Sequence, residues 1–353
     1  MFHCRPKARL RPIARAGIAV AALSVCFAGS VAAQSVAEFY QGKSMTLICY
    51  STAGSTYDLY SRMLARHMPN HVPGKPSSMI VKNMVGAGGY TATRFLYHTA
   101  PKDGSHIGNI SRGIPFEPLL GGGQVVDFDP LKFYWLGSMS RESALTVTWH
   151  TSPVKTAADL FTTELLVAGS GAGADSEIIA KALNGLVGTK YKIISGYTSL
   201  TVAALAMERG EVEGIAYWSW GAINTNRPDW VPDKKLNLLF QTAMTPHPDI
   251  PNVPLAVDVL AKTPEDRQGL ELLFARDIIA RPFLAPPDLP ADRAKALRAA
   301  FEATLKDSAL LAEADKVRAE IELVSGEEIE KLLIKSMATP PAVVERLRNA
   351  MNR

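Results

Sequence analysis

The chain has 353 residues, more than one hydrophobic core usually organises, so two domains are expected. With 47% hydrophobic and 20% charged residues, the composition excludes a disordered chain. Its 38 basic and 34 acidic residues are unevenly distributed, because residues 1–33 carry five basic side chains and no acidic one. Without that segment 33 basic residues face 34 acidic ones, and nothing favours nucleic-acid binding.

The amino-terminal segment has the pattern of a cleavable signal peptide. A basic start is followed by the apolar run Ala16–Gly29 and by the small residues Val31-Ala32-Ala33. Cleavage is expected before Gln34, which makes residues 1–33 the signal peptide and the periplasm the destination. A disordered start, a membrane anchor and lipidation of Cys26 are the alternatives, although valine before Cys26 fits a lipoprotein signal poorly.

Cysteine use agrees with export and limits covalent stabilisation. Cys4 and Cys26 lie in the segment to be removed, so the mature chain retains only Cys49. No intramolecular disulfide can form, and the apolar surroundings of Cys49 in the sequence favour a core residue over a nucleophile. We expect a monomer stabilised by packing alone.

Short apolar runs alternate with amphipathic stretches along most of the chain, a pattern typical of parallel sheets with helices on both faces. In the first half the pattern predicts strands and helices, in order, at Met45–Ser51 (strand), Thr56–Met68 (helix), Ser78–Val85 (strand), Tyr90–Thr99 (helix) and His106–Ser111 (strand), and then a strand pair near Tyr134–Trp149. The second run comprises Leu165–Gly169 (strand), Asp175–Leu186 (helix), Tyr191–Ser195 (strand), Ser199–Glu208 (helix) and Gly214–Trp218 (strand).

From Thr263 onward the chain is mostly helical and rich in charge, with Ala291–Leu305 following a group of prolines. We therefore expect two α/β lobes. Residues 34–140 and 256–353 would form lobe 1, with the helical C-terminal tail on it, and residues 141–255 lobe 2. Hinges are expected near Gly137–Ser143 and Pro251–Ala256.

Candidate ligand loops follow the predicted strands, because ligands of open α/β sheets bind at the carboxyl ends of strands. These loops are Tyr50–Asp58, Asn83–Gly89, Gly169–Asp175, Gly196–Ser199 and Trp218–Gly221. Small residues at a helix start favour an anion, and Trp218 could cover the apolar body of a ligand. Capped turns and core aromatics are the structural alternatives.

Catalytic and nucleotide-binding patterns are missing. Gly169–Asp175 lacks the G-x-G-x-x-G spacing, and no nucleophile elbow occurs. Pro69 breaks the helix that would align His67 and His71 for a metal. We expect no enzyme, no cofactor and no metal.

The loops together resemble the periplasmic substrate-binding receptors of the tripartite tricarboxylate transporter family, also called Bug receptors. The resemblance rests on Ala53-Gly54-x-x-x-Asp58, on Val81-x-Asn83-x-x-Gly86-Ala87-Gly88-Gly89, on Pro101-x-Asp103-Gly104, and on Gly196-Tyr197 with Gly210-Glu211-Val212-Glu213. It departs from the family at Ser55, where members usually have a second glycine.

The resemblance implies a two-lobed periplasmic-binding-protein-like fold (type II-like) that closes on a small organic carboxylate and passes it to membrane permease subunits. It implies ligand contacts at Ala53, Gly54, Ser55, Thr56, Asp58 and Gly88 in the first lobe and at Gly171, Gly173 and Tyr197 in the second. Asp58 is expected to orient the loop, or a water, rather than touch an anionic ligand directly. An exported enzyme with an unrecognised site and a receptor for a sensor kinase are the alternatives.

Overall fold

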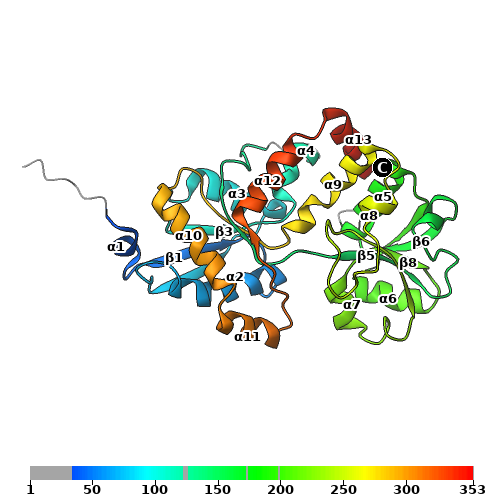
Figure 1. Ribbon diagram of the computed structural model, residues 1–353, viewed down its shortest axis with the longest axis horizontal. Helices are drawn as coiled ribbons and strands as arrows, with labels where there is room; N and C mark the ends of the chain where they lie inside the picture. Colours follow the sequence, from blue (N-terminus) through cyan, green and yellow to red (C-terminus); the bar gives the residue numbers. More distant parts are fainter. Residues whose placement is uncertain (1–33, 122–125, 172–173, 198, 353) are drawn as a thin grey trace, which may run out of the picture. The chain divides into compact units, whose positions relative to one another are not determined.

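The computed structural model describes residues 34–121, 126–171, 174–197 and 199–352, and the residues from Ser35 onward form one compact unit (Figure 1). The predicted signal peptide 1–33, with Cys26, and the predicted site residue Gly173 lie outside the described residues. Within the described part, no helix is both long and apolar enough to cross a membrane.

The first sheet has six strands in the order β11-β4-β10-β3-β1-β2. Strands β1, β2 and β3 pair in parallel, whereas β10 is antiparallel to both β3 and β4, and β11 is antiparallel to β4. Alternate side chains of β1 enter different cores: Leu47 and Cys49 pack toward Met63 of α2, and Ile48 belongs to the core that contains Leu96. The strands are β1 (Ser44–Cys49), β2 (Ser78–Asn83), β3 (His106–Asn109), β4 (Tyr134–Ser138), β10 (Pro282–Ala285) and β11 (Val324–Ser325).

The second sheet has five strands in the order β7-β6-β8-β5-β9. Here β6 is parallel to β7 and β8, and β5 is antiparallel to β8 and β9. Val167 of β6 packs with Leu183 of α5, while Ala168 packs with Ala203 of α6, so the two helices cover opposite faces (Figure 1). The strands are β5 (Ala144–Trp149), β6 (Leu165–Gly169), β7 (Tyr191–Ser195), β8 (Gly214–Ser219) and β9 (Leu236–Gln241).

The helices begin at local signals in the sequence. Ser35, Thr263 and Ser325 each form a capping box with an acidic residue three positions later, which satisfies backbone N–H groups at the helix start. The helices are α1 (Val36–Tyr40), α2 (Thr56–His67), α3 (Tyr90–Arg94), α4 (Glu117–Leu120), α5 (Asp175–Val187), α6 (Leu200–Glu208), α7 (Trp220–Asn226), α8 (Ala256–Val259), α9 (Pro264–Ile278), α10 (Ala291–Thr304), α11 (Ser308–Lys316), α12 (Gly326–Met337) and α13 (Pro341–Met351).

Two segments carry the chain between the sheets and run beside each other. Residues 139–143 link β4 to β5, and residues 279–281 link α9 to β10. Backbone bonds join them: the N–H of Met139 donates to the carbonyl of Arg281 (3.1 Å), and the N–H of Ala280 donates to the carbonyl of Ser140 (3.2 Å). The first predicted hinge therefore falls on a real crossover. The second does not, because Pro251–Ala256 stays beside β9 through the bond from Gln241 N–H to the Pro254 carbonyl.

Most of the C-terminal tail packs on the first sheet, as expected: α10 and α12 contact β4, and α11 contacts α2. The last helix continues further. Helix α13 packs against α5 of the second sheet, and α9 also contacts α5. The assignment of lobes by residue number stays a prediction.

Two expectations about the strands were wrong. The strand pair near Tyr134–Trp149 is no pair, since β4 and β5 belong to different sheets. Both sheets are mixed rather than parallel, because β10, β11 and β5 run against their neighbours. Strand β10 sits fully buried inside the first sheet even though it begins at a proline, which a strand tolerates at its first residue.

Candidate functional site

The loop after β1 is organised by Asp58, a buried residue of the first turn of α2. Its Oδ2 accepts hydrogen bonds from the N–H of Gly54 (2.8 Å) and from Nε of Arg62 (2.9 Å), and its Oδ1 accepts one from Nδ2 of Asn83 (2.8 Å). Ser55 caps the helix by accepting from the N–H of Asp58. Asp58 thus fixes the loop, the role that the sequence suggested for it.

The ionised form of Asp58 is stabilised by its hydrogen bonds. Burial of the carboxyl opposes ionisation, but hydrogen bonds from Arg62, Asn83 and Gly54 outweigh it and lower the pKa of Asp58 to about 2. The carboxylate is paired with Arg62 and holds the backbone of Gly54, so its hydrogen bonds go to the protein itself.

The loop after β6 repeats this design in the second sheet. The N–H of Gly171 donates to Oε1 of Glu177 at 2.9 Å, as Gly54 does to Asp58. In both loops, an amide that the family resemblance assigned to the ligand donates instead to an acidic side chain of the following helix. Tyr197 is partly buried, and its N–H donates to the carbonyl of Gly169.

Gly88 and Trp218 lie in contrasting surroundings. Gly88 is exposed, with a φ of +65° in the short turn before α3, and a Cβ there would meet nothing within 4 Å. Trp218 is 1% exposed and packs edge-on against Trp230, with ring centroids 6.1 Å apart. Since adjacent strand residues face opposite sides of a sheet, its neighbour Tyr217 points to the other side.

Tyr217 belongs to a buried group of charges that spacing in the sequence did not reveal, and which we call the Arg112 cluster. Arg112 follows β3, and its Nη2 lies 2.7 Å from Oδ2 of Asp175, the first residue of α5. Its Nη1 lies 3.2 Å from Oδ1 of Asp277, which also accepts from the Tyr217 hydroxyl (2.8 Å). Arg276 completes the cluster, with Nη2 2.7 Å from the other oxygen of Asp175.

The cluster joins elements of both sheets, and Asp277 is its most buried carboxyl. Arg112 comes from the first sheet, and Asp175 and Tyr217 come from the second. Burial raises the pKa of Asp277 to about 6, although Arg112 and Arg276 oppose the rise. For Asp175 the balance is reversed: burial acts against the charge, yet Arg276 and Arg112 lower its pKa. A charged residue directly after a predicted strand was the one signal that could have pointed to Arg112.

A cavity of about 1050 Å³, which we call the cleft, is lined by residues from both halves of the fold. Thr56 and Tyr60 of α2 line one part, Ser219 and residues of α7 line another, and residues 140–143 with Arg281 lie between them. Of the predicted ligand residues, Thr56 therefore lines this cavity. The residues that line the cleft come from helix α2 beside the first sheet, from the carboxyl end of β8 in the second sheet and from both crossovers.

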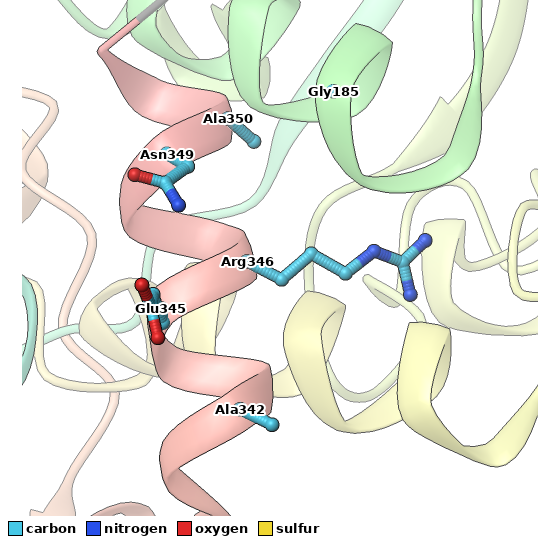
Figure 2. Close-up of a pocket in the computed structure, with 6 residues that line it drawn as sticks. All are labelled: Gly185, Ala342, Glu345, Arg346, Asn349 and Ala350. Carbon is cyan, nitrogen blue, oxygen red and sulfur yellow. The ribbon is translucent and has the colours of Figure 1, made fainter.

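Two smaller cavities lie elsewhere. One of about 350 Å³ lies between α5 and α13, where Arg346 extends from α13 (Figure 2) and its Nη2 lies 2.8 Å from Asp266. Another, of about 340 Å³, lies between α9 and α12 and is mainly apolar. Among the residues that the structure describes, no group of three or more His, Cys, Asp or Glu side chains could hold a metal ion.

The architecture is similar to that of solved solute-binding proteins. A TctC solute-binding protein from Polaromonas has a TM-score of 0.67 and 18% identity, with 87% of this chain and 99% of that chain covered. The periplasmic binding protein BugD has a TM-score of 0.55 and 18% identity, with 88% and 98% covered. MatC from Rhodopseudomonas palustris, solved with bound malate, has a TM-score of 0.53 and 18% identity, with 88% and 99% covered.

No family model and no curated protein matches the sequence. The likeness to the solved structures therefore establishes the fold: an α/β, two-lobed, periplasmic-binding-protein-like architecture shared with TctC and Bug proteins. The predicted fold class, and the resemblance at the level of fold, are confirmed.

Proposed function

We propose that this protein is a periplasmic receptor that captures a small organic carboxylate in the cleft and delivers it to a tripartite tricarboxylate-type membrane permease. The observation that carries the proposal is the cleft itself, a large cavity whose walls come from elements of both sheets and from both crossovers. Supporting it, TctC and BugD share the fold, and MatC was solved with malate.

Closure of the cleft is the proposed mechanism. A ligand favours a closed form only by its differential affinity for that form, and a ligand that touches both walls has such a difference. The crossovers at 139–143 and 279–281 are the places where two rigid lobes would bend. Closure would bring Ala53–Thr56 of the first lobe toward Gly171 and Tyr197 of the second.

The remaining parts of the proposal follow from the sequence. Residues 1–33 are removed on export, the mature chain is monomeric, no cofactor is used and the protein is not an enzyme. The lobes proposed from the sequence are residues 34–140 with 256–353 and residues 141–255, and the crossover at 279–281 moves the second boundary from 256 to about 280. Gly88 remains a first-lobe contact. Because Trp218 is buried in the core, we assign it support of the second lobe rather than ligand contact.

A thermal-shift screen of mono-, di- and tricarboxylates, followed by small-angle scattering with the best hit, tests the proposal. The expected result is a raised melting temperature together with a smaller radius of gyration. Trp220, at the start of α7 beside the cleft, should change its fluorescence. If no carboxylate raises the melting temperature, the receptor function is wrong. If one does while the radius and fluorescence stay constant, closure is wrong.

A further inference from the structure

Arg281 occupies an unusual position, on a crossover and in the cleft at once. Its N–H donates to Oγ of Ser138 (3.0 Å), which anchors its backbone beside β4. Its side chain lines the cleft, with Cζ 4.7 Å from the ring centroid of Tyr57 and 5.4 Å from that of Tyr60. Both rings belong to α2, so aromatic faces of the first lobe hold the guanidinium in place.

The charge of Arg281 is poorly neutralised although its side chain is only 15% exposed. The nearest carboxylate oxygen, Oε2 of Glu142, lies 4.0 Å away and is shared with Arg112 at 3.8 Å. Within the described residues, the guanidinium donates one hydrogen bond, to the carbonyl of Ala280, and its Nε is buried without a partner. Arg141, on the same cleft, instead binds Glu322 and Glu328 at 2.8 and 3.0 Å.

Carboxylates outnumber arginines on the walls of the cleft, which also carry His247. Among its described lining residues, four are acidic (Glu142, Asp315, Glu320, Glu322) and three are arginines. A ligand with one carboxylate on Arg281 would place any further carboxylate near these acids, which repel it. Leu311, Ala314 and Ile321 supply apolar surface in the same cavity.

We propose that Arg281 binds the carboxylate of the ligand and that the acidic walls restrict the cleft to monocarboxylates with an uncharged, partly apolar body. The inference rests on the proposed receptor function and narrows it. A guanidinium pairs with a carboxylate through two parallel hydrogen bonds, which a poorly neutralised arginine can supply. Because Arg281 also lies on a crossover, the ligand would attach directly to the segment that bends.

Arg281→Gln tests the anchor, with Arg318→Gln as the control. Arg318 lines the same cleft but is exposed, so this control removes the same charge from the same cavity. Affinity for the best monocarboxylate, measured by calorimetry, should fall about tenfold or more in Arg281→Gln and only a few-fold in Arg318→Gln. Arg281→Lys should recover part of the loss, because it restores the charge without the paired donors. Equal affinities of the wild type and Arg281→Gln would overturn the inference.

Hexanoate, 4-hydroxybenzoate, malate, adipate and citrate are the probes for selectivity. Hexanoate or 4-hydroxybenzoate should raise the melting temperature of the wild type more than the three multivalent acids do. Tighter binding of malate, adipate or citrate contradicts the monocarboxylate inference while the receptor function stands. Thermal unfolding of each variant without ligand shows whether it is folded, and Arg281→Lys keeps the test valid if Arg281→Gln is not.

Discussion

The Arg112 cluster and the cleft each present an arginine with a side chain that is 15% exposed, but the two arginines meet different surroundings. Arg112 has carboxylate oxygens of Asp175 and Asp277 at 2.7 and 3.2 Å, whereas Arg281 has its nearest one at 4.0 Å. Burial alone therefore does not separate a structural arginine from one that faces a ligand. What differs is the distance to the nearest carboxylates, which leaves the Arg281 guanidinium less neutralised than that of Arg112.

Replacing Arg112 should have the largest effect, since it leaves the buried carboxyl of Asp277 without the arginine that lies 3.2 Å from it and leaves Asp175 with Arg276 alone. Arg112→Met is expected to lower the free energy of unfolding by about 3–5 kcal/mol in urea titrations. Arg94→Met is the control, because Arg94 pairs with Asp127 at 2.6 Å but its side chain is 50% exposed, and it should cost about 1 kcal/mol or less. Similar losses for the two variants would show that the cluster is not a structural element.

Gly54→Val should abolish carboxylate binding but lower the free energy of unfolding less than Arg112→Met does. Gly54 has a φ of +80°, a conformation that costs a residue with a Cβ about 1–2 kcal/mol, and its loop precedes Thr56 at the cleft. Gly188→Val is a matched control: its φ is +78°, and neither position has an atom within 4 Å of an added Cβ. We expect both to lose similar stability but only Gly54→Val to lose carboxylate binding in calorimetry. Retained binding by Gly54→Val would remove this loop from the site.

Asp58→Asn should show how far the loop depends on one charge. The pKa of Asp58 in the folded protein, about 2, lies below its ordinary value of 3.8. The ionised carboxylate therefore stabilises the fold above about pH 4, and this stabilisation is lost as the pH falls toward 2. The variant should be about 1–2 kcal/mol less stable than the wild type at pH 7, with the two converging near pH 2 in pH-dependent unfolding. A difference that stays constant across this range would mean that the charge is not responsible.

Thr56→Ala is expected to have the smallest effect and to separate binding from stability. Ser55, not Thr56, caps α2, so removing the Thr56 hydroxyl should change the unfolding free energy by less than about 0.5 kcal/mol. Since Thr56 lines the cleft, carboxylate affinity should weaken by about 0.5–1.5 kcal/mol. Ser55→Ala should show the reverse pattern: it should lower the free energy of unfolding by about 1 kcal/mol and leave carboxylate affinity nearly unchanged. If Thr56→Ala destabilises as much as Ser55→Ala, the hydroxyl supports the helix.

Local patterns predicted local structure well. The bounds expected for β6 and β7 agree with the structure, and α2 and α5 end within one residue of their predicted limits. Asp58 was correctly expected to orient its loop, because an acidic residue in the first turn of a helix reaches back to the preceding backbone. These features depend on residues close together in the sequence.

Pairings between segments that are distant in the sequence could not be predicted from local patterns. Strand β10 is four residues long and begins with Pro282, a residue that the sequence pattern associates with the start of a helix. It is a strand because it pairs with β3 and β4. Strand periodicity placed Tyr217 and Trp218 on opposite faces but could not tell which face met the Arg112 cluster. The cluster itself gathers residues 112, 175, 217, 276 and 277, whose spacing matches no motif.

The position of α13 has a consequence for the order of folding. Arg346 of this helix donates to the carbonyl of Leu186, 160 residues earlier in the chain, and strand β10 inserts between β3 and β4 from a similar distance. The first sheet lacks β10 and β11, and the second sheet lacks the cover of α13, until the last part of the chain has been synthesised. Such non-local topologies fold slowly, and until β10 arrives the edges of β3 and β4 stay open to pairing with other chains. A chain truncated before β10 should therefore be prone to aggregation through these edges, whereas a chain truncated before α13 keeps β10 and loses the helix that covers α5.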